Sequence, residues 1–507
     1  MKKKNLKQGD VQTWIIKRLQ KALPQEKNVI NVERSFAEYG LGSLQAVSLA
    51  GDLEKWLKKP VSPTLFLEHE NISALSAFLC QEDLPTSTPT TPPPELKTNR
   101  TQYKKILTEF KHFPEIVDLE NFKKYVRKKA GMDLFFQVTE GMPVSDIRID
   151  GKKFINFSSY NYLDMASHAN NIKQLITSVK RFGTSASASR LVGGEKPVHV
   201  ALEKELSRFI NTEACVVFNS GHATNVSTIG HMMKKNDLIL LDKLSHNSIV
   251  QGALLSGATL RYFEHNDPQS LSALLTSLRD QYDRVLIVTE GVFSMDGDIA
   301  PIPAYIALKK KHHALLYVDE AHSIGVLGKK GQGIREYFNL KGTEVDFWMG
   351  TLSKALGSCG GYIAGQKTLI EYLKFSAPSF VYSCGLSPAD TAAALASLIH
   401  LRKNPTLPAV LQARSAYFLD ALQRANINTG LSSCTPVIPI MIGHSDKAIQ
   451  LCAALRRKGL FLQALFYPAV EPNASRLRAF INCSHTEAQL RKAAKLIASE
   501  MHDLGLL

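Results

Sequence analysis

Lys354 is the residue whose surroundings point most directly to chemistry. It lies in the segment "GTLSKALGSCGG" (350–361), among Gly, Ser, Ala and Leu residues and away from other charges. A lysine is normally a surface cation whose charged head stays in water. Small and apolar neighbours favour burial instead, and a desolvated amine is a good nucleophile. We therefore expect Lys354 to hold the aldehyde of a cofactor as a Schiff base.

Asp319 and His322 form the second candidate group. They follow the apolar run "ALLYV" (314–318), which is typical of a buried strand. An acid at the end of such a strand would keep a pyridine nitrogen protonated and make the ring an electron sink, while the histidine would reach a phenolic oxygen. Alone, Asp-x-x-His also fits a helix cap and a structural histidine. Together with Lys354, it favours pyridoxal phosphate (PLP).

The large C-terminal part of the chain alternates short apolar runs with longer helical stretches. Two further runs, "LILLDKLSHNS" and "VLIVTEGVFSMDGD", also end in polar residues. This alternation predicts an α/β fold around a mostly parallel sheet, with ligands beyond the carboxyl ends of the strands. The tail from about Pro405 should form a smaller domain.

Ser43 is the candidate in the N-terminal part. It precedes apolar residues at helical spacing, so its hydroxyl should lie at a helix N-terminus, where a phosphodiester is favourably placed. A simple N-cap is the alternative. Three such stripes predict a small helical bundle: Val11, Trp14, Ile15, Leu19 and Ala22; Leu44, Val47, Leu53 and Leu57; Ile72, Leu75 and Phe78.

Composition separates the domains and excludes several classes of protein. Residues 84–100 are rich in Pro and Thr, which predicts a linker between a domain at 1–83 and one at 101–507. The net charge of +15 is spread along 507 residues without a dense basic stripe, so we expect no nucleic-acid partner. Seven cysteines without paired or metal-binding spacing indicate a cytoplasmic protein with no metal site. No apolar run is long enough to predict a transmembrane segment.

The N-terminal segment "GLGSLQAVSLAGDLEKWLKKPVSPTLFLEHENISALSAFL" resembles acyl carrier domains of polyketide synthases. The resemblance implies that Ser43 carries 4'-phosphopantetheine. Two features depart from that family: Gly42 stands where an Asp is usual, and the domain lacks the common acidic balance.

From about residue 150 onward the chain resembles the α-oxoamine synthases, which are fold-type I PLP enzymes. The resemblance rests on "NFSSYNYLDMASH", "GTSASASRLVGGEKPVHVALE", "FNSGHATN", "DKLSHNSIVQGA", "TEGVFSMDGDIAPI", "VDEAHSIGVLG", "TLSKALG" and "SRLRAFINCSHT" in order. It implies that His246 stacks on the cofactor, Thr351 binds its phosphate and Arg478 holds an amino acid carboxylate, with Arg476 as runner-up. The implied pocket also includes Gly221, His222, Glu290 and Ser294; the family more often has Tyr or Phe where His222 stands.

The expected reaction is the decarboxylative condensation of a small amino acid with an acyl thioester to an α-aminoketone. We expect a homodimer, served by a phosphopantetheinyl transferase and an acyl-loading enzyme. One alternative uses free acyl-CoA and leaves the N-terminal domain for docking. Others are a non-catalytic scaffold and an aminotransferase or lyase.

Overall fold

The computed structural model describes residues 7–22, 30–34, 36, 43–57, 61, 65–69, 71–80, 108–433, 435–466, 469–470 and 473–507. Gly42 and the 84–100 linker lie outside these residues. Two compact units are present. The first comprises Met1–Asp133, Gly443–Asp446 and Phe466–Ser475, and the second comprises Leu134–Ile442, Lys447–Leu465 and Arg476–Leu507.

The N-terminal bundle follows the apolar stripes in the sequence. Its helices are α1 (Gln8–Ala22), α2 (Ser43–Leu57), α3 (Leu65–Glu68) and α4 (Ile72–Leu79). Val11, Ile15, Leu53 and Leu75 are fully buried in the shared core. The short α3 has no stripe of its own in the sequence analysis, because four residues are too few to show helical periodicity. Helix α2 begins at Ser43.

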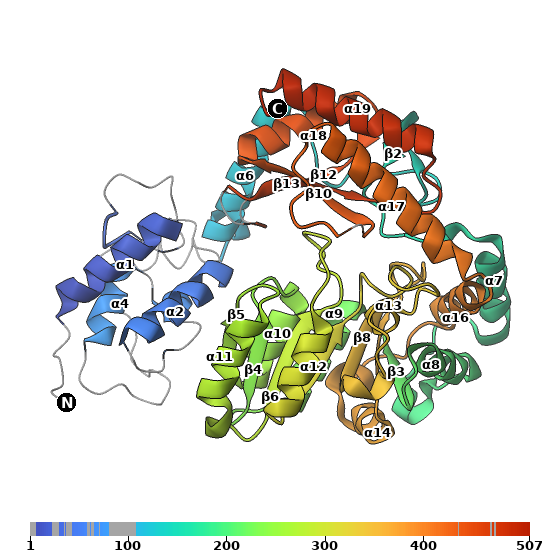
Figure 1. Ribbon diagram of the computed structural model, residues 1–507, viewed down its shortest axis with the longest axis horizontal. Coiled ribbons are helices and arrows are strands. Elements are labelled where there is room, and N and C mark those ends of the chain that lie inside the picture. The colour runs from blue at the N-terminus through green and yellow to red at the C-terminus, as the bar shows by residue number, and fades with distance from the viewer. Residues whose placement is uncertain are drawn as a thin grey trace. The chain divides into compact units, whose positions relative to one another are not determined.

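The central sheet of the second unit has seven strands, in the order β3-β9-β8-β7-β6-β4-β5. Only β9 runs antiparallel to its neighbours, which confirms the mostly parallel sheet. Helices pack around it in Figure 1. The strands are β3 (Ala214–Phe218), β4 (Leu238–Asp242), β5 (Thr259–Phe263), β6 (Val285–Glu290), β7 (Leu315–Asp319), β8 (Phe347–Thr351) and β9 (Gly361–Gly365). The α-helices from α7 to α16 are α7 (Ala169–Phe182), α8 (Pro197–Ile210), α9 (Gly221–Met232), α10 (Asn247–Ser256), α11 (Pro268–Leu278), α12 (Ile302–Lys311), α13 (Gly333–Tyr337), α14 (Lys367–Ser376), α15 (Pro378–Val381) and α16 (Pro388–Lys403).

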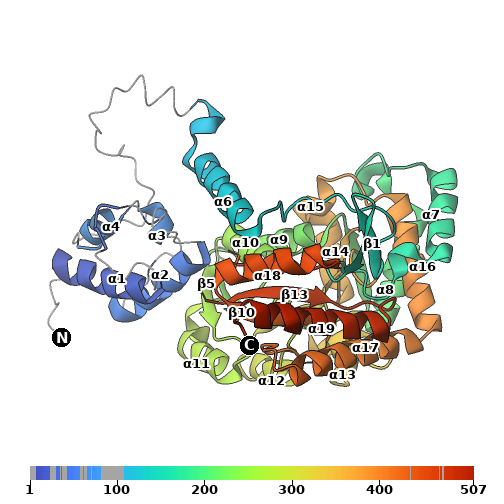
Figure 2. The same cartoon turned by 90° about the horizontal axis from the view of Figure 1, so that it is seen from above.

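Two three-stranded sheets accompany the C-terminal helices. One has the order β10-β13-β12 and the other β1-β2-β11. Strand β2 precedes the central sheet in sequence, yet it pairs in parallel with β11 near the end of the chain. Figure 2 shows β10 and β13 together with α18 and α19. The bounds are β1 (Asp146–Ile149), β2 (Lys152–Asn156), β10 (Val437–Gly443), β11 (Leu460–Phe461), β12 (Gln463–Leu465), β13 (Ser475–Phe480), α6 (Pro114–Ala130), α17 (Thr406–Arg424), α18 (Ser445–Arg457) and α19 (Glu487–Asp503).

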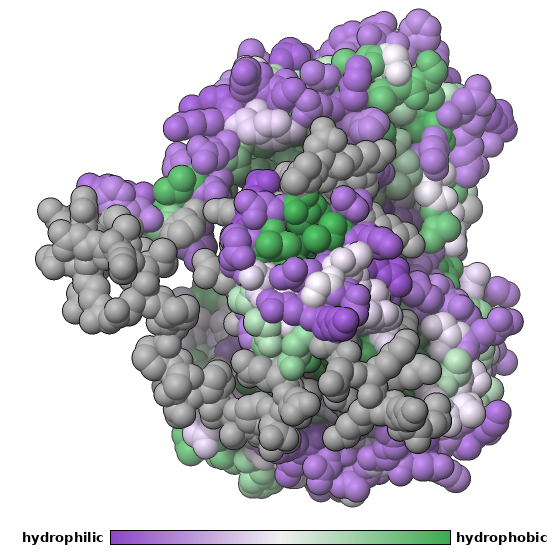
Figure 3. All heavy atoms as spheres, turned by 90° about the vertical axis from the view of Figure 1, so that its left-hand side faces the viewer, coloured by the Kyte–Doolittle hydropathy of each residue, from purple (hydrophilic) through white to green (hydrophobic). Residues whose placement is uncertain are grey.

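Hydrophilic side chains cover much of the face drawn in Figure 3, and the apolar ones gather in separate patches. Among the helices that the structure describes, none is long and apolar enough to cross a membrane.

Candidate active site

The candidate residues gather at one edge of the central sheet. Strands β6, β7 and β8 run parallel, so their carboxyl ends meet there. Glu290 ends β6, Asp319 ends β7 and Thr351 ends β8, and Glu290 lies opposite Asp319 in the register. All three are buried. The strand order thus assembles polar groups that lie up to 61 positions apart in the sequence, from 290 to 351.

Lys354 lies just past β8, in contact with His322. The Lys354 Nζ and His322 Nε2 atoms are hydrogen-bonded at 2.8 Å, and the Tyr162 hydroxyl lies 2.7 Å from His322 Nδ1. Part of Lys354 is reached by solvent, but protein atoms crowd it enough that burial lowers its pKa to about 8. Burial also lowers the pKa of His322 well below the usual value, so the imidazole is neutral. Lysine, histidine and tyrosine therefore form one hydrogen-bonded row.

The lowered pKa of Lys354 predicts the pH dependence of cofactor loading. Only the neutral amine attacks an aldehyde, so the rate of PLP binding to the apoenzyme should rise with pH and level off above about pH 8. Stopped-flow absorbance after mixing apoenzyme with PLP measures this rate. A rate that is still rising at pH 10, as for an ordinary lysine with a pKa near 10.4, would contradict the assignment.

Both side-chain oxygens of Asp319 accept a hydrogen bond. Its Oδ2 accepts from Asn225 Nδ2 at 2.8 Å and its Oδ1 accepts from the backbone N–H of Ala321 at 2.9 Å. The Tyr317 hydroxyl in turn donates to Asn225 Oδ1 at 2.6 Å, which orients the amide. Burial, followed by the nearby Asp319 charge, raises the pKa of Glu290 well above its usual value. The position and hydrogen bonds of Asp319 suit a partner for a protonated pyridine nitrogen.

His246 stands at the N-terminus of α10 with part of its side chain exposed. Its Nδ1 is hydrogen-bonded to Ser248 Oγ at 2.7 Å, and its backbone N–H donates to Glu290 Oε1 at 2.7 Å. Desolvation lowers the pKa of His246, which keeps the ring neutral. A neutral, partly exposed ring is suited to stack on an aromatic cofactor, and hydrogen bonds of the ring and of the backbone hold His246 in place.

Gly221 and Thr351 form a candidate phosphate cradle. Gly221 opens α9, and Ser220 caps that helix by accepting from the backbone N–H of Ala223. A Cβ at Gly221 would lie 3.1 Å from Thr351 Oγ1, and one at Gly361 would lie 2.7 Å from Gly221 Cα. The two glycines keep the helix N-terminus open beside a hydroxyl, which suits an anionic group. His222 is exposed on the first turn of α9.

The two arginines of β13 have different partners. Arg476 forms a buried ion pair with Asp296 at 2.5 Å. Arg478 donates to the backbone oxygen of Ser294 at 2.7 Å and lies over the Phe480 ring, and among the described residues it has no carboxylate partner. Arg478 is therefore the arginine with capacity for an incoming carboxylate, whereas Arg476 is neutralised.

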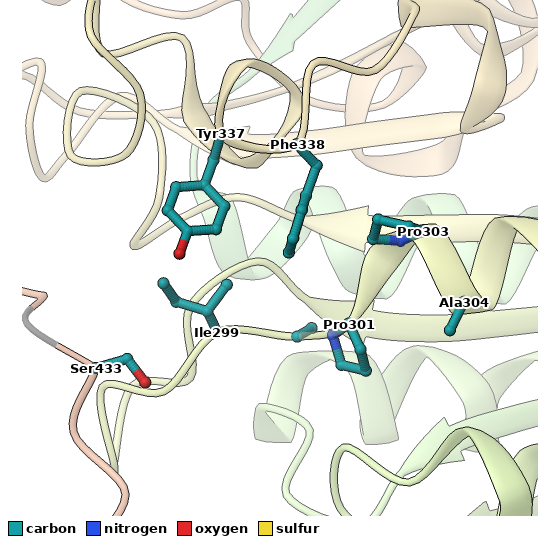
Figure 4. A pocket seen from close by; sticks show the side chains of 8 residues that line it. Ile299, Pro301, Pro303, Ala304, Tyr337, Phe338 and Ser433 are labelled. Carbon is teal, nitrogen blue, oxygen red and sulfur yellow. The ribbon is translucent and has the colours of Figure 1, made fainter.

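Two hollows lie in the second unit. One of about 350 Å³ is lined by Tyr160 and Ser353 among others, and the Nζ of Lys354 is 5.8 Å from the centre of the Tyr160 ring. The other, of about 490 Å³, is mostly apolar; in Figure 4 the rings of Tyr337 and Phe338 point toward Ile299 and Pro301. Tyr160 links the first hollow to Lys354, and none of the candidate cofactor residues lines the second.

These residues fit PLP: a crowded amine of lowered pKa, a hydrogen-bonded carboxylate, a neutral stacking ring and an open helix N-terminus. Five residues of the site are not predicted from the sequence: Tyr160, Tyr162, Asn225, Tyr317 and Ser248. Tyr162 and Asn225 stand in quoted motifs, "NYLD" and "GHATN", but nothing in their spacing shows which of those polar side chains turns inward.

Comparison with known proteins identifies the families that the chain resembles. Residues 152–497 match the family of class I and II aminotransferases, and residues 13–79 match the phosphopantetheine attachment site family. The chain is 38% identical over 394 residues to 8-amino-7-oxononanoate synthase of Thermoanaerobacter pseudethanolicus, covering 77% of this chain and 99% of that protein. It is 39% identical, with the same coverage, to the enzyme of that name from Treponema denticola.

Solved structures agree. A serine palmitoyltransferase from Sphingomonas wittichii superposes with a TM-score of 0.74 at 28% identity, covering 79% of this chain and all of that one. An 8-amino-7-oxononanoate synthase from Francisella tularensis gives a TM-score of 0.60 at 27% identity, covering 69% and 99%.

Fold and site together define a fold-type I PLP-dependent transferase preceded by a phosphopantetheine attachment domain. Within that class the chain belongs to the α-oxoamine synthases, PLP-dependent acyltransferases that condense an amino acid with an acyl thioester. Its cofactors are PLP and phosphopantetheine.

Proposed function

We propose that this enzyme condenses a small amino acid with an acyl chain carried on its own N-terminal domain, and releases an α-aminoketone. The observation that carries the proposal is the presence of a phosphopantetheine attachment domain and an α-oxoamine synthase in one chain. Peptide mass spectrometry of protein from its own host tests it, because the peptide that contains Ser43 should carry phosphopantetheine and an acyl group.

The carrier part of the proposal assigns the arm to Ser43, the first residue of α2. The N-terminus of a 15-residue helix stabilises the phosphodiester through its dipole. Residues 84–100, which are rich in Pro and Thr, then serve as a tether between the two domains. Such a tether raises the effective concentration of the thioester to the millimolar range.

The chemistry assigns each step to a residue of the site. The amino acid carboxylate binds Arg478. His246 stacks on the cofactor ring, and Asp319 pairs with the charge of the ring nitrogen. PLP, when bound, accepts the electron pair of the α-carbon. The neutral amine of Lys354, whose pKa is about 8, takes the α-proton.

The remaining steps form and break one bond each. The α-carbon attacks the thioester carbonyl, and the thiol of the arm leaves. Carbon dioxide is lost from the β-keto acid, and Lys354 returns its proton to the α-carbon. His322, which is hydrogen-bonded to Lys354 Nζ and to the Tyr162 hydroxyl, holds the amine in place. Thr351 with Gly221 takes the phosphate, and Glu290, Ser294 and His222 complete the pocket.

The same condensation with free acyl-CoA is the second candidate. It is favoured by Gly42, which stands where carrier domains usually have the Asp before the modified serine. In that case the N-terminal domain serves only for docking, and removal of Ser43 leaves turnover intact.

We also propose that the enzyme acts as a homodimer in the cytoplasm. A phosphopantetheinyl transferase installs the arm, and a separate enzyme loads the acyl chain. The domain limits are 1–83 for the carrier, 84–100 for the linker and 101–507 for the synthase, with the smaller subdomain from about 405.

The carboxylate role of Arg478 predicts a selective loss of amino acid affinity. Arg478→Lys keeps the charge but loses the planar fork, so KM for the amino acid should rise about 10- to 100-fold, equivalent to one charged hydrogen bond. Steady-state kinetics at saturating thioester measure it. Arg424→Lys, at an exposed position of α17, is the matched control. An amino acid KM within twofold of wild type in Arg478→Lys would refute the role.

A further inference from the structure

His265 lies between two aspartates just past the end of β5. Its Nδ1 is 2.8 Å from Asp242 Oδ1 and its Nε2 is 2.8 Å from Asp298 Oδ2. Burial alone would lower the pKa of His265, but the hydrogen bonds to both carboxylates outweigh it and raise the pKa to about 10. Both ring nitrogens therefore donate, and the imidazolium joins two segments that are 56 positions apart, from 242 to 298.

Asp242 anchors the turn that leads to His246. Its Oδ1 accepts from the backbone N–H of Leu244 at 2.9 Å and its Oδ2 from that of Asn266 at 2.9 Å. The backbone N–H of Ser245 donates to the Asp242 carbonyl at 3.0 Å. The position of Asp242 thus determines where the turn that carries His246 begins.

Asp298 closes the loop that binds Arg476 and Arg478. The Phe293 N–H donates to the Asp298 carbonyl at 3.1 Å, and the Gly297 N–H donates to the Phe293 carbonyl at 2.9 Å. Within this loop, the Ser294 carbonyl accepts from Arg478 at 2.7 Å. The side chain of Asp296 binds Arg476, so the loop holds both arginines of β13.

We propose that His265 is a positioning residue for the amino acid substrate. It fixes the Arg478 loop relative to the His246 turn and so sets the distance between carboxylate site and cofactor. Both carboxylates are buried, and within the described part of the chain the only other side chain bonded to Asp298 is the neutral amide of Asn266. Without the imidazolium, two buried carboxylates lose their shared cation and the loop shifts. The inference rests on the proposed carboxylate role of Arg478.

The test is His265→Gln, which keeps a donor but removes the charge and one of the two bonds. We expect KM for the amino acid to rise 10- to 100-fold while KM for the acyl thioester changes less than threefold, because only the carboxylate site moves. Glycine, L-alanine and L-serine are titrated with an acyl-CoA series as donor. The visible spectrum of the bound cofactor, titrated with the same amino acids without donor, should give a parallel loss of affinity.

Two further variants separate positioning from folding. His265→Gln/Asp298→Asn removes the unpaired carboxylate and should recover at least fivefold in amino acid affinity. His199→Gln, at a fully buried histidine bonded to the Lys196 N–H and the Leu386 carbonyl, is the control and should leave both KM values unchanged. If His265→Gln does not fold, Asp298→Asn, in which the bond to Asp242 remains, is measured instead.

Unchanged amino acid affinity in a folded, PLP-loaded His265→Gln protein would overturn the inference, and so would a parallel rise in both KM values. Failure of the proposed function is distinguishable, because the wild-type protein would then turn over no thioester while the spectral titration still reports amino acid binding.

Discussion

Lys354→Ala should lower turnover about a thousandfold or more. The variant loses the amine that holds the cofactor and takes the α-proton, and general acid–base catalysis alone contributes about 10²- to 10⁴-fold. The structure gives the site no substitute: His322, the nearest base, is hydrogen-bonded to Lys354 itself and to Tyr162. Turnover is measured as thiol release from acyl-CoA in the presence of amino acid and excess PLP.

The control for this variant is Lys367→Ala, which removes an exposed lysine at the start of α14 and should leave turnover unchanged. Lys354→Arg should behave like Lys354→Ala, because a guanidinium keeps the charge but forms no imine. If either Lys354 variant kept more than a tenth of wild-type turnover, the assignment of the catalytic amine would be wrong.

Ser43→Ala should reduce carrier-dependent turnover at least about a hundredfold at micromolar donor. Without the hydroxyl no arm is attached, and the site loses a tethered donor whose effective concentration is millimolar. The measurement compares variants made without the arm and treated with a phosphopantetheinyl transferase and limiting acyl-CoA. The transferase moves acyl-phosphopantetheine to the Ser43 hydroxyl and releases adenosine 3',5'-bisphosphate.

Ser48→Ala, in the same helix, is the matched control and should turn over like wild type. Mixing Ser43→Ala with Lys354→Ala adds a second test. Each protein lacks one function, so recovered turnover means that the carrier of one chain serves the synthase of another. Equal rates for Ser43→Ala and Ser48→Ala would instead favour free acyl-CoA as the donor.

The frame of the site was predictable because strands leave strong local signals. The runs that become β4, β6 and β7 are apolar and end in Asp242, Glu290 and Asp319. Parallel pairing then requires these ends to lie at one edge of the sheet, so Asp319 and Lys354 could be expected near each other. The strands that local apolar runs mark could therefore be predicted from the sequence.

Other parts depend on pairing across the chain. Strand β2 pairs with β11, some 300 positions later, and no local pattern identifies that partner. Tyr162 and Asn225 act through hydrogen bonds whose geometry exists only after folding. The choice between Arg476 and Arg478 was open in the sequence, and it is the ion pair of Arg476 with Asp296 that favours Arg478.

The central claim is that the acyl group leaves Ser43 for the amino acid within this enzyme. The most direct test treats the purified protein, made without its arm, with acyl-CoA and a phosphopantetheinyl transferase, which moves acyl-phosphopantetheine to the Ser43 hydroxyl and releases adenosine 3',5'-bisphosphate. Free CoA is then removed, and the intact mass is followed after amino acid is added. We expect the acyl mass to disappear, the phosphopantetheine mass to remain and one α-aminoketone to form per acyl group lost. An acyl mass that persists while the same sample consumes added free acyl-CoA would contradict the claim.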